Sequence, residues 1–265
     1  MPAASPPAGP LAGLLTLVTG ASSGIGAATA EKFAGAGSNL LLLARRRERL
    51  EQLAAQLRGD HGIETRVITS DVSDAAGVTA AFESLPAEWR SVDILVNNAG
   101  LVKGVAPEWE ATPEDVDVMI DTNVKGLITM TRLCVPGMLA RSRGHVINIG
   151  SIAGQETYPG GSIYNATKFA TRALSRGLKM DLQGTPIRVS SIDPGLVETE
   201  FSLVRYDGDT EKAAAIYADT EPLRPEDIAD AVLFAATRPA HVNISEMLVF
   251  ATDQAAARMI HRRQK

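Results

Sequence analysis

Residues 14–26 read LLTLVTGASSGIG, an apolar run that leads into three glycines within seven positions. The apolar run is typical of a short buried strand, and the pattern GIGAATAEKFAGAG over residues 24–37 predicts a helix after it. Glycines between a strand and a helix allow backbone N–H groups to approach a pyrophosphate at the positive end of the helix. The stretch therefore predicts a strand–turn–helix unit that binds a dinucleotide, and a glycine-rich turn without a ligand is the alternative.

The three glycines have different expected tasks. Gly20 allows the tight turn, Gly24 allows the phosphate to come close, and Gly26 lets the helix pack on the sheet. The spacing G-x-x-x-G-x-G differs from the commoner G-x-G-x-x-G, so the strand and helix around it carry more weight than the letters. The hydroxyls of Ser22 and Ser23, inside the turn, are candidate donors to a bound phosphate.

Working outward from this unit, apolar runs alternate with helical patterns along the chain. Six later runs are typical of strands: residues 39–45, 64–72, 92–100, 145–154, 187–195 and 246–252. Helices are expected at residues 46–60 and 78–89, among others. Runs that are apolar throughout suit strands covered on both faces. The alternation predicts an α/β fold, a single doubly wound parallel sheet with helices on both faces.

The same pattern indicates one domain over residues 11–265. Residues 1–10 are rich in Pro, Ala and Gly and are expected to form a flexible tail. Residues 195–223 break the rhythm between a strand and a helix, so we expect them to form a substrate lid. The tail lacks the pattern of a secretory signal, and the apolar runs are too short to span a bilayer. A cytoplasmic location without membrane contact is therefore expected.

Composition argues against several other classes of function. The formal net charge of −5 and the absence of a long basic segment predict no nucleic-acid surface. The single cysteine, Cys134, cannot form an intramolecular disulfide and is expected to be a buried, inert thiol. The four histidines, His61, His145, His241 and His261, are scattered along the chain, so no metal site is predicted.

The end of the second expected strand indicates which dinucleotide binds. This stretch reads LLARRRE, with Arg45 at 19 residues after Gly26 and Arg46 next to it. Sites that prefer NAD place an acidic residue here to bond the ribose 2′-hydroxyl, whereas a guanidinium binds the 2′-phosphate of NADP. We therefore predict NADP(H) rather than NAD(H), and a solvated helix start is the alternative.

Tyr164 and Lys168 are four residues apart, so in a helix both side chains lie on one face. A nearby ammonium is expected to lower the phenol pKa, which suits Tyr164 to move a proton to or from a substrate oxygen. Ser151, after an expected strand, is a candidate hydrogen-bond partner for that oxygen. Asn123 is a candidate to hold an ordered water that is linked to Lys168. Alone, the pair also occurs in helices as a half-buried tyrosine beside a surface lysine.

Together these motifs resemble the short-chain dehydrogenase/reductase family over nearly the whole chain after the tail. The resemblance rests on TGASSGIG (19–26), NNAG (97–100), YNATK (164–168) and PGLVET (194–199). It implies a Rossmann-type fold of about seven strands and hydride transfer to or from C4 of a nicotinamide. It also implies a catalytic tetrad of Asn123, Ser151, Tyr164 and Lys168. The turn, the arginines and the resemblance together predict cofactor contacts at Gly20, Ser22, Ser23, Gly24, Ile25, Gly26, Arg45, Arg46, Asp71, Val72, Asn98, Ala99, Gly100, Tyr164, Lys168, Pro194, Gly195, Val197 and Thr199.

A narrower resemblance concerns the substrate. SIAGQETYPGGSIY (151–164) and PGLVETEFSLVRYDGD (194–209) are similar to the branch of NADP-dependent 3-hydroxy acid dehydrogenases that act on serine, allo-threonine or 3-hydroxypropionate. A 3-hydroxy acid carries a carboxylate that needs a cation, and Arg205 in the expected lid is the candidate. Gln155 and Ser151 are further candidate substrate contacts. An ion pair of Arg205 with Asp207 or Asp209, or a subunit contact, is the alternative.

Three other functions remain open. A reductase of ketones, diketones or ketoacyl thioesters would use the same tetrad with an apolar pocket. A nucleotide-binding regulator would need no tyrosine–lysine pair, and a Rossmann-type methyltransferase gives no reason for Ser151, Tyr164 and Lys168. The family is usually oligomeric and often tetrameric, so the resemblance implies a homotetramer that acts on a small-molecule substrate.

Overall fold

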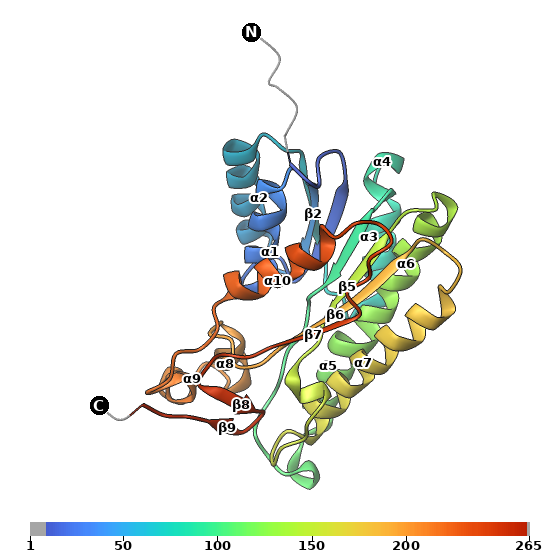
Figure 1. Ribbon diagram of the computed structural model, residues 1–265. Helices are drawn as coiled ribbons and strands as arrows, with labels where there is room; N and C mark the ends of the chain where they lie inside the picture. Colours follow the sequence, from blue (N-terminus) through green and yellow to red (C-terminus); the bar gives the residue numbers. More distant parts are fainter. Residues whose placement is uncertain (1–8, 264–265) are drawn as a thin grey trace.

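A parallel sheet of seven strands forms the centre of the molecule in the computed structural model, which describes residues 9–263 (Figure 1). The strands lie in the order β3-β2-β1-β4-β5-β6-β7, and each neighbouring pair is parallel. Their bounds are β1 Leu15–Thr19, β2 Asn39–Ala44, β3 Thr65–Thr69, β4 Ile94–Asn97, β5 His145–Ile149, β6 Arg188–Pro194 and β7 Glu246–Val249. The predicted fold class is confirmed, whereas residues 1–8 of the expected tail lie outside the described residues.

Helices cover both faces of this sheet (Figure 1). One face carries α1 (Gly24–Gly35), α2 (Arg47–His61) and α10 (Pro225–Ala236). The other carries α3 (Ala75–Glu83), α6 (Leu127–Ala140) and α7 (Ser162–Asp181). The helix expected at residues 78–89 is two helices, because Pro86 disfavours a helical residue before it and so separates α3 from α4 (Ala87–Arg90).

The strands are apolar throughout because both of their faces are covered. On β2, Leu40 and Leu42 pack against the α1 side of the sheet, while Leu41 and Leu43 pack against the α6 side. Successive strand residues point to opposite faces, so one unbroken apolar run contributes to two cores. Cys134 of α6 lies in the second core, and burial raises the pKa of its thiol to about 12, as expected for an inert cysteine.

The strand order reverses between β1 and β4, which are neighbours in the sheet. In open parallel sheets, ligands bind in the crevice outside the carboxyl ends of the strands at such a point. Two helices of the expected lid, α8 (Phe201–Arg205) and α9 (Thr210–Tyr217), lie beyond these ends (Figure 1). A C-terminal hairpin of β8 (Gln254–Ala256) and β9 (Met259–Ile260) lies beside them.

The C-terminal segment is attached through Arg263 to residues 195–223, the segment predicted to be a lid and called the predicted lid below. Its backbone N–H donates to the carbonyl of Asp219 (2.7 Å), and its guanidinium pairs with Glu221 (2.8 Å) and Asp253 (3.0 Å). The backbone N–H of Glu221 also donates to the Asp253 carboxylate (2.9 Å). The hairpin and the predicted lid therefore form one connected unit beside the carboxyl ends of the strands.

Candidate active site

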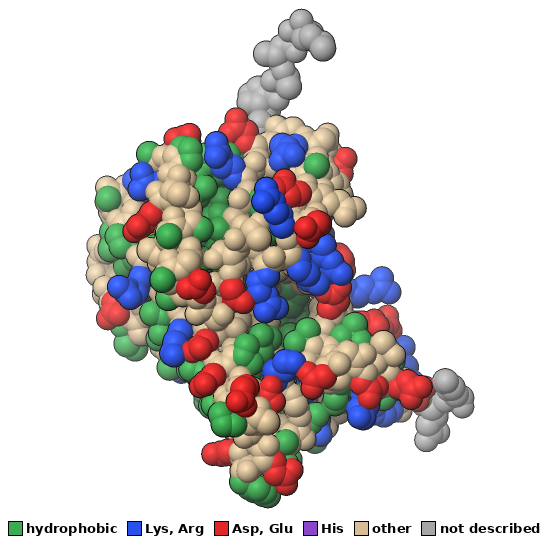
Figure 2. Space-filling view, turned by 180° about the vertical axis from the view of Figure 1, so that it is seen from behind, with side chains coloured by type: hydrophobic (Ala, Val, Ile, Leu, Met, Phe, Trp, Pro, Cys, Tyr) green, Lys and Arg blue, Asp and Glu red, His purple; other side chains and the backbone are tan. Residues whose placement is uncertain are grey.

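A cavity of about 430 Å³ opens between the carboxyl ends of the strands and the predicted lid. Figure 2 shows the side opposite to that of Figure 1, where the surface is hollowed between the main body and the smaller part below it. The predicted cofactor positions that line the cavity are Gly20, Ser22, Ser23, Gly24, Ile25, Arg45, Arg46, Asp71, Val72, Asn98, Ala99, Gly100, Tyr164, Lys168, Pro194, Gly195, Val197 and Thr199. Gly26 is the predicted cofactor position that does not lie on its wall.

The glycine turn has the geometry of an anion site. Gly20 and Gly24 have φ values of 65° and 52°, a left-handed conformation that glycine adopts without strain. A Cβ at Gly26 would lie 2.4 Å from the carbonyl oxygen of Gly20, so a side chain there would push α1 away from the turn. Ser23, at the N-cap of α1, makes no capping bond through its side chain. The capping side chain therefore offers no hydrogen-bond acceptor to the first N–H groups of α1. These groups lie at the N-terminal end of the helix, which attracts anions.

Arg46 joins this turn to the predicted lid. Its Nε donates to Ser22 Oγ (3.1 Å), and its Nη2 donates to Ser23 Oγ (2.6 Å). Its Nη1 donates to Glu200 Oε2 (2.7 Å), just before α8. The guanidinium and the two hydroxyls thus meet at the end of β2, where the sequence predicts recognition of a 2′-phosphate.

Two members of this cluster escaped the sequence analysis, Arg49 and Glu200. Arg49 Nη1 donates to Glu200 Oε1 (2.7 Å), and the hydrogen bonds from Arg46 and Arg49 lower the pKa of Glu200 to about 2. Arg46 is the N-cap of α2 and Arg49 follows it by three residues, so the two side chains lie on the same side of the helix start. The sequence does contain this spacing. Arg45 also pairs with Asp71, at 3.4 Å. Three guanidinium groups thus face the carboxylates of Asp71 and Glu200, and the net charge of the cluster is positive.

Ser151, Tyr164 and Lys168 meet on the cavity wall near the end of β5. Lys168 Nζ donates to the carbonyl oxygen of Ile149 (2.9 Å) and lies 6.0 Å from the centroid of the Tyr164 ring. Burial lowers the pKa of Lys168 to about 8, and the carboxylate of Asp193 acts in the opposite direction. Lys168 is therefore a buried cation whose charge can change slightly above neutral pH.

The pKa of the Tyr164 phenol is raised, mainly by burial and to a lesser degree by nearby Tyr158. A hydrogen bond with Ser151 and the charge of Arg205 act in the opposite direction. The expectation that this phenol has a lowered pKa is therefore wrong, because desolvation outweighs the charge of Arg205 and the hydrogen bond with Ser151. Tyr164 holds its proton at neutral pH and is suited to donate it.

Asn123 lies next to the wall of the cavity rather than on it. It sits in a π-helical turn, Asp121–Gly126, between α5 (Pro113–Ile120) and α6. Its Nδ2 donates to the Leu101 carbonyl (2.8 Å) and to Thr167 Oγ1 (3.0 Å), and its Oδ1 accepts the Leu101 N–H (2.8 Å). A Cβ at Gly100 would lie 3.3 Å from Asn123 Oδ1 and 3.8 Å from Lys168 Nζ, so both groups border the space above this glycine.

Arg205 reaches the cavity from α8. Its Nη2 donates to the hydroxyl of Tyr158 (3.3 Å), and its guanidinium carbon lies 5.6 Å from the centroid of that ring. The alternative ion pairs with Asp207 and Asp209 are absent from residues 9–263, where each of these carboxylates pairs with a lysine instead. The buried Nε of Arg205 has no hydrogen-bond partner within the same residues.

Tyr158 and Arg258 are wall residues that the sequence analysis missed. The guanidinium carbon of Arg258, in the turn between β8 and β9, lies 5.5 Å from the centroid of the Tyr158 ring. The backbone N–H of Ala257 donates to Glu156 Oε2 (2.8 Å) and holds this turn beside the site. No local pattern reveals that contact, because about a hundred residues separate the two segments.

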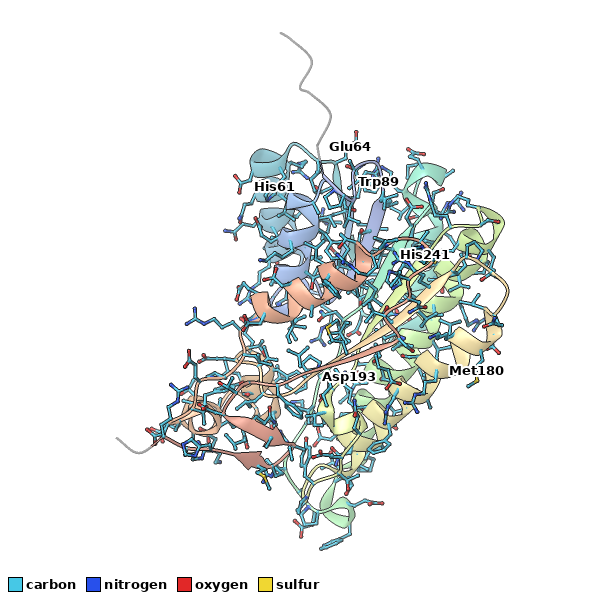
Figure 3. The ribbon with its side chains drawn as sticks, viewed as in Figure 1. His61, Glu64, Trp89, Met180, Asp193 and His241 are labelled. Carbon is cyan, nitrogen blue, oxygen red and sulfur yellow. The ribbon has the colours of Figure 1, made fainter. Side chains whose placement is uncertain are left out.

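Gln155, by contrast, does not line the cavity. Its Nε2 donates to Asp193 Oδ2 (3.0 Å). Figure 3 shows Asp193 near the centre of the molecule, with His61 and His241 well away from it.

In the described part of the chain, no three His, Cys, Asp or Glu side chains are grouped so that they could hold a metal ion. Among the helices over residues 9–263, none combines the length and apolar character needed to cross a membrane.

Comparison with known proteins links this site to a family. The family model described as short chain dehydrogenase matches residues 15–208. The chain is 47% identical over 251 residues to the NADP-dependent 3-hydroxy acid dehydrogenase YdfG of Salmonella typhi, covering 94% of this chain and 100% of that protein. It is 43% identical to the NADP-dependent 3-hydroxy acid dehydrogenase of Schizosaccharomyces pombe, covering 96% of this chain and 98% of that one.

A solved structure agrees with the sequence matches. The closed form of a serine dehydrogenase complexed with NADP⁺ superposes with a TM-score of 0.87 at 45% identity. That match covers 95% of this chain and 100% of the other. Identity at this level over nearly the full length of both proteins, with the tyrosine, lysine and serine on one cavity wall, shows that the chain belongs to the short-chain dehydrogenase/reductase family.

Proposed function

We propose that the protein is an NADP-dependent dehydrogenase of small 3-hydroxy acids, such as serine, allo-threonine or 3-hydroxypropionate. The observation that carries the substrate class is Arg205, a guanidinium on the same cavity wall as Ser151 and Tyr164 that has no acidic partner within residues 9–263. The curated relatives named as 3-hydroxy acid dehydrogenases, at 43–47% identity, support the same reading.

NADP(H) is the cofactor that the cavity fits. The glycine turn would allow backbone N–H groups to approach a bound pyrophosphate. Arg45 and Arg46 line the same cavity and would supply the cations that a 2′-phosphate needs. Ser22 and Ser23 would add hydroxyl donors beside Arg46. When bound, the nicotinamide supplies or accepts the hydride at its C4.

The proton moves through Tyr164. In the reducing direction, a carbonyl oxygen takes the phenol proton of Tyr164 while its carbon gains the hydride, and the product is an alcohol. In the oxidising direction, the alcohol oxygen returns its proton to the phenolate. The hydrogen bond with Ser151 favours the phenolate. Ser151 would also bond the substrate oxygen, since it lines the same cavity wall. Lys168, with its pKa of about 8, is mostly charged at neutral pH and stabilises the negative charge that Tyr164 develops.

Arg205 orients the acid. A bidentate contact with a carboxylate fixes both its position and its plane, which reduces the motion of the substrate before hydride transfer. In a 3-hydroxy acid the carboxylate carbon is two bonds from the reacting carbon, so Arg205 must act at short range from Tyr164. Arg205 and Tyr164 line the same cavity, which supports that proximity.

We also infer a homotetramer in the cytoplasm. Phe169 and Met180 of α7 are 40% and 75% exposed, and both are large apolar side chains that a subunit interface would cover. Met180 projects outward at the end of α7 in Figure 3. Light scattering of the purified chain is expected to give four times the mass of one subunit, and a monomer would contradict the assembly.

A substrate panel tests the proposed function. NADP⁺ reduction is followed with L-serine, L-allo-threonine, 3-hydroxypropionate, 3-hydroxybutyrate and a neutral secondary alcohol, and each assay is repeated with NAD⁺. Turnover of the acids with NADP⁺ supports the proposal. Turnover of the neutral alcohol alone would favour the alternative, a reductase of ketones, diketones or ketoacyl substrates.

A further inference from the structure

The end of α8 is bonded to the loop that follows β4, residues 98–107. The backbone N–H of Gly104 in that loop donates to the carbonyl oxygen of Arg205 (3.1 Å), the last residue of α8. Lys103, next to Gly104, forms an ion pair with Asp207, two residues after Arg205. A backbone hydrogen bond and an ion pair thus hold the chain at, and just after, the residue proposed to bind the substrate carboxylate.

Asp207 has a backbone conformation for which glycine is the ordinary choice. Its φ is 51°, in the left-handed region, directly after the cap of α8. The N–H of Gly208 donates to the Leu203 carbonyl (2.8 Å). Together with the Asp207 N–H, which donates to the Val204 carbonyl (3.4 Å), this bond forms the Schellman motif that ends many helices. Glycine takes this position without strain, so the ion pair with Lys103 is what gives an aspartate a reason to be there.

The loop that carries Lys103 is itself anchored. Asn123 exchanges two hydrogen bonds with the backbone of Leu101, two residues before Lys103, and both are 2.8 Å long. On the other side, a Cβ at Gly160 would lie 3.2 Å from the carbonyl oxygen of Val105, so the loop packs closely on the turn before α7. Lys103 therefore extends from a backbone that is fixed on both sides, and it holds the predicted lid from there.

Neither side chain of this ion pair lies where it would touch the substrate. The wall of the main cavity includes Arg205 but neither Lys103 nor Asp207. Lys103 lines a separate cavity of about 50 Å³, and the side chain of Asp207 is 74% exposed. The ion pair can therefore act on the substrate through the position of Arg205.

The side chain of Arg205 has little support of its own. Within residues 9–263, its guanidinium donates one hydrogen bond, to the Tyr158 hydroxyl at 3.3 Å, and it has no carboxylate partner. Its buried Nε has no hydrogen-bond partner in the same residues. The place of this guanidinium thus depends on where the end of α8 lies, and a displacement of about 1 Å is enough to weaken an oriented contact.

We propose that the Lys103–Asp207 ion pair positions Arg205, and that Lys103 thereby contributes to the preference for acidic over neutral substrates. The inference rests on the proposed function, in which Arg205 binds the carboxylate of a 3-hydroxy acid. An exposed ion pair changes an equilibrium by at most about fivefold, because water and salt weaken it. A contact that is equally strong in the bound substrate and in the transition state affects KM and not kcat.

The first test compares 3-hydroxypropionate with the neutral 3-hydroxypropanamide, both oxidised with NADP⁺. Lys103→Met is expected to raise KM for the acid about three- to fivefold and to leave kcat, KM for the amide and the Kd of NADPH unchanged. Lys103→Arg keeps the charge and is expected to keep the preference for the acid. Lys212→Met is the matched control, because Lys212 pairs with Asp209 (3.1 Å) inside the predicted lid and does not join it to the loop after β4.

Double variants test the route through Arg205. In Arg205→Met the substrate carboxylate has lost its guanidinium, so adding Lys103→Met is expected to raise KM for the acid no further. Asp207→Asn breaks the same ion pair, so Asp207→Asn with Lys103→Met is expected to match either single variant.

Asp207→Gly separates positioning from general damage. It removes the ion pair and the left-handed strain together, so KM for the acid is expected to rise while the Tm is not lowered. A lower Tm with equal losses for acid and amide would show that Asp207 supports the fold alone, and it would overturn the proposal.

The remaining outcomes distinguish the two levels of inference. A further rise in KM when Lys103→Met is added to Arg205→Met overturns the positioning role, because Lys103 then acts by another route. If the unaltered chain prefers the acid and Lys103→Met keeps that preference, the positioning role fails and the proposed function stands. If the unaltered chain oxidises the amide as readily as the acid, both fail, because Arg205 does not recognise the carboxylate.

Discussion

Arg46 Nη1 and Glu200 Oε2 lie 2.7 Å apart. This ion pair connects the glycine-turn side of the cavity with the start of α8, although the two residues are 154 positions apart in the sequence. The second oxygen of Glu200 is bonded to Arg49, so one carboxylate engages two guanidinium groups. Both partners of the Arg46 pair are 42% exposed, and exposed ion pairs contribute about 1 kcal/mol or less to stability. The main consequence of this contact is therefore expected for cofactor binding and not for stability.

Replacing Glu200 by Gln is expected to tighten the binding of NADPH about three- to tenfold and to leave NADH nearly unchanged. The carboxylate, with a pKa of about 2, stays charged at any working pH and competes with a 2′-phosphate for the N–H groups of Arg46. Fluorescence titration of both cofactors checks this, with Glu83→Gln on α3 as the matched control. Weaker NADPH binding would mean that Glu200 instead holds Arg46 in the right orientation.

Replacing Arg46 by Ala should lower the affinity for NADPH by about 10- to 100-fold, the worth of a charge-assisted hydrogen bond, and the affinity for NADH by much less. Arg47→Ala is the control, because Arg47 is the next residue and, among residues 9–263, pairs only with Glu51, one helical turn along α2. Dissociation constants of the two cofactors for each variant give the answer. Equal losses for NADPH and NADH would remove Arg46 from 2′-phosphate recognition.

Arg45→Asp tests the other predicted cation in the same way. The new carboxylate would repel both Asp71, its present ion-pair partner at 3.4 Å, and a 2′-phosphate. NADPH affinity is expected to fall far more than NADH affinity, so the ratio of the two dissociation constants changes. A constant ratio would show that Arg45 does not discriminate between the cofactors.

Local motifs explain why much of the fold and part of the site could be predicted. The strand, turn and helix at residues 14–37 are neighbours in sequence, and Tyr164 and Lys168 share one face of α7, so spacing alone predicts their proximity. Glu200, Tyr158 and Arg258 could not be found in this way, since their contacts join distant segments. The raised pKa of Tyr164 also escaped prediction, because desolvation depends on the packed structure and not on spacing.

Replacing Tyr164 by Phe is expected to reduce turnover by at least about 10³-fold while NADPH still binds. We propose the phenol as the group that gives a proton to the substrate oxygen, and general acid catalysis typically contributes about 10²- to 10⁴-fold. Tyr217→Phe, which removes a hydroxyl bonded to Ser202 and to the Val197 carbonyl, is a control for loss of a nearby phenol. Turnover retained in Tyr164→Phe would reject the role of Tyr164 as proton donor.

Replacing Asp193 by Asn should move the alkaline limit of activity to lower pH. Asp193 is buried, accepts hydrogen bonds from Ser191 Oγ (2.6 Å) and Gln155 Nε2 (3.0 Å), and its charge raises the pKa of Lys168, which burial has lowered to about 8. Without that charge, the pKa of Lys168 falls further. A lysine loses its charge as the pH rises through its pKa. In the variant, the charged fraction of Lys168 therefore begins to fall at a lower pH, and activity is expected to fall with it.

The pH–rate profile distinguishes this effect from simple damage. Rates with NADP⁺ and a 3-hydroxy acid are measured from about pH 6 to about pH 10 for the unaltered chain, Asp193→Asn and the control Asp181→Asn at the end of α7. Asp193→Asn is nearly isosteric, so its rate near pH 6 is expected to stay within a few fold of the unaltered rate, whereas its rate near pH 9 falls more steeply. A loss of the same factor at every pH would show that Asp193 supports the packing around Gln155 and Ser191 and does not tune the charge of Lys168.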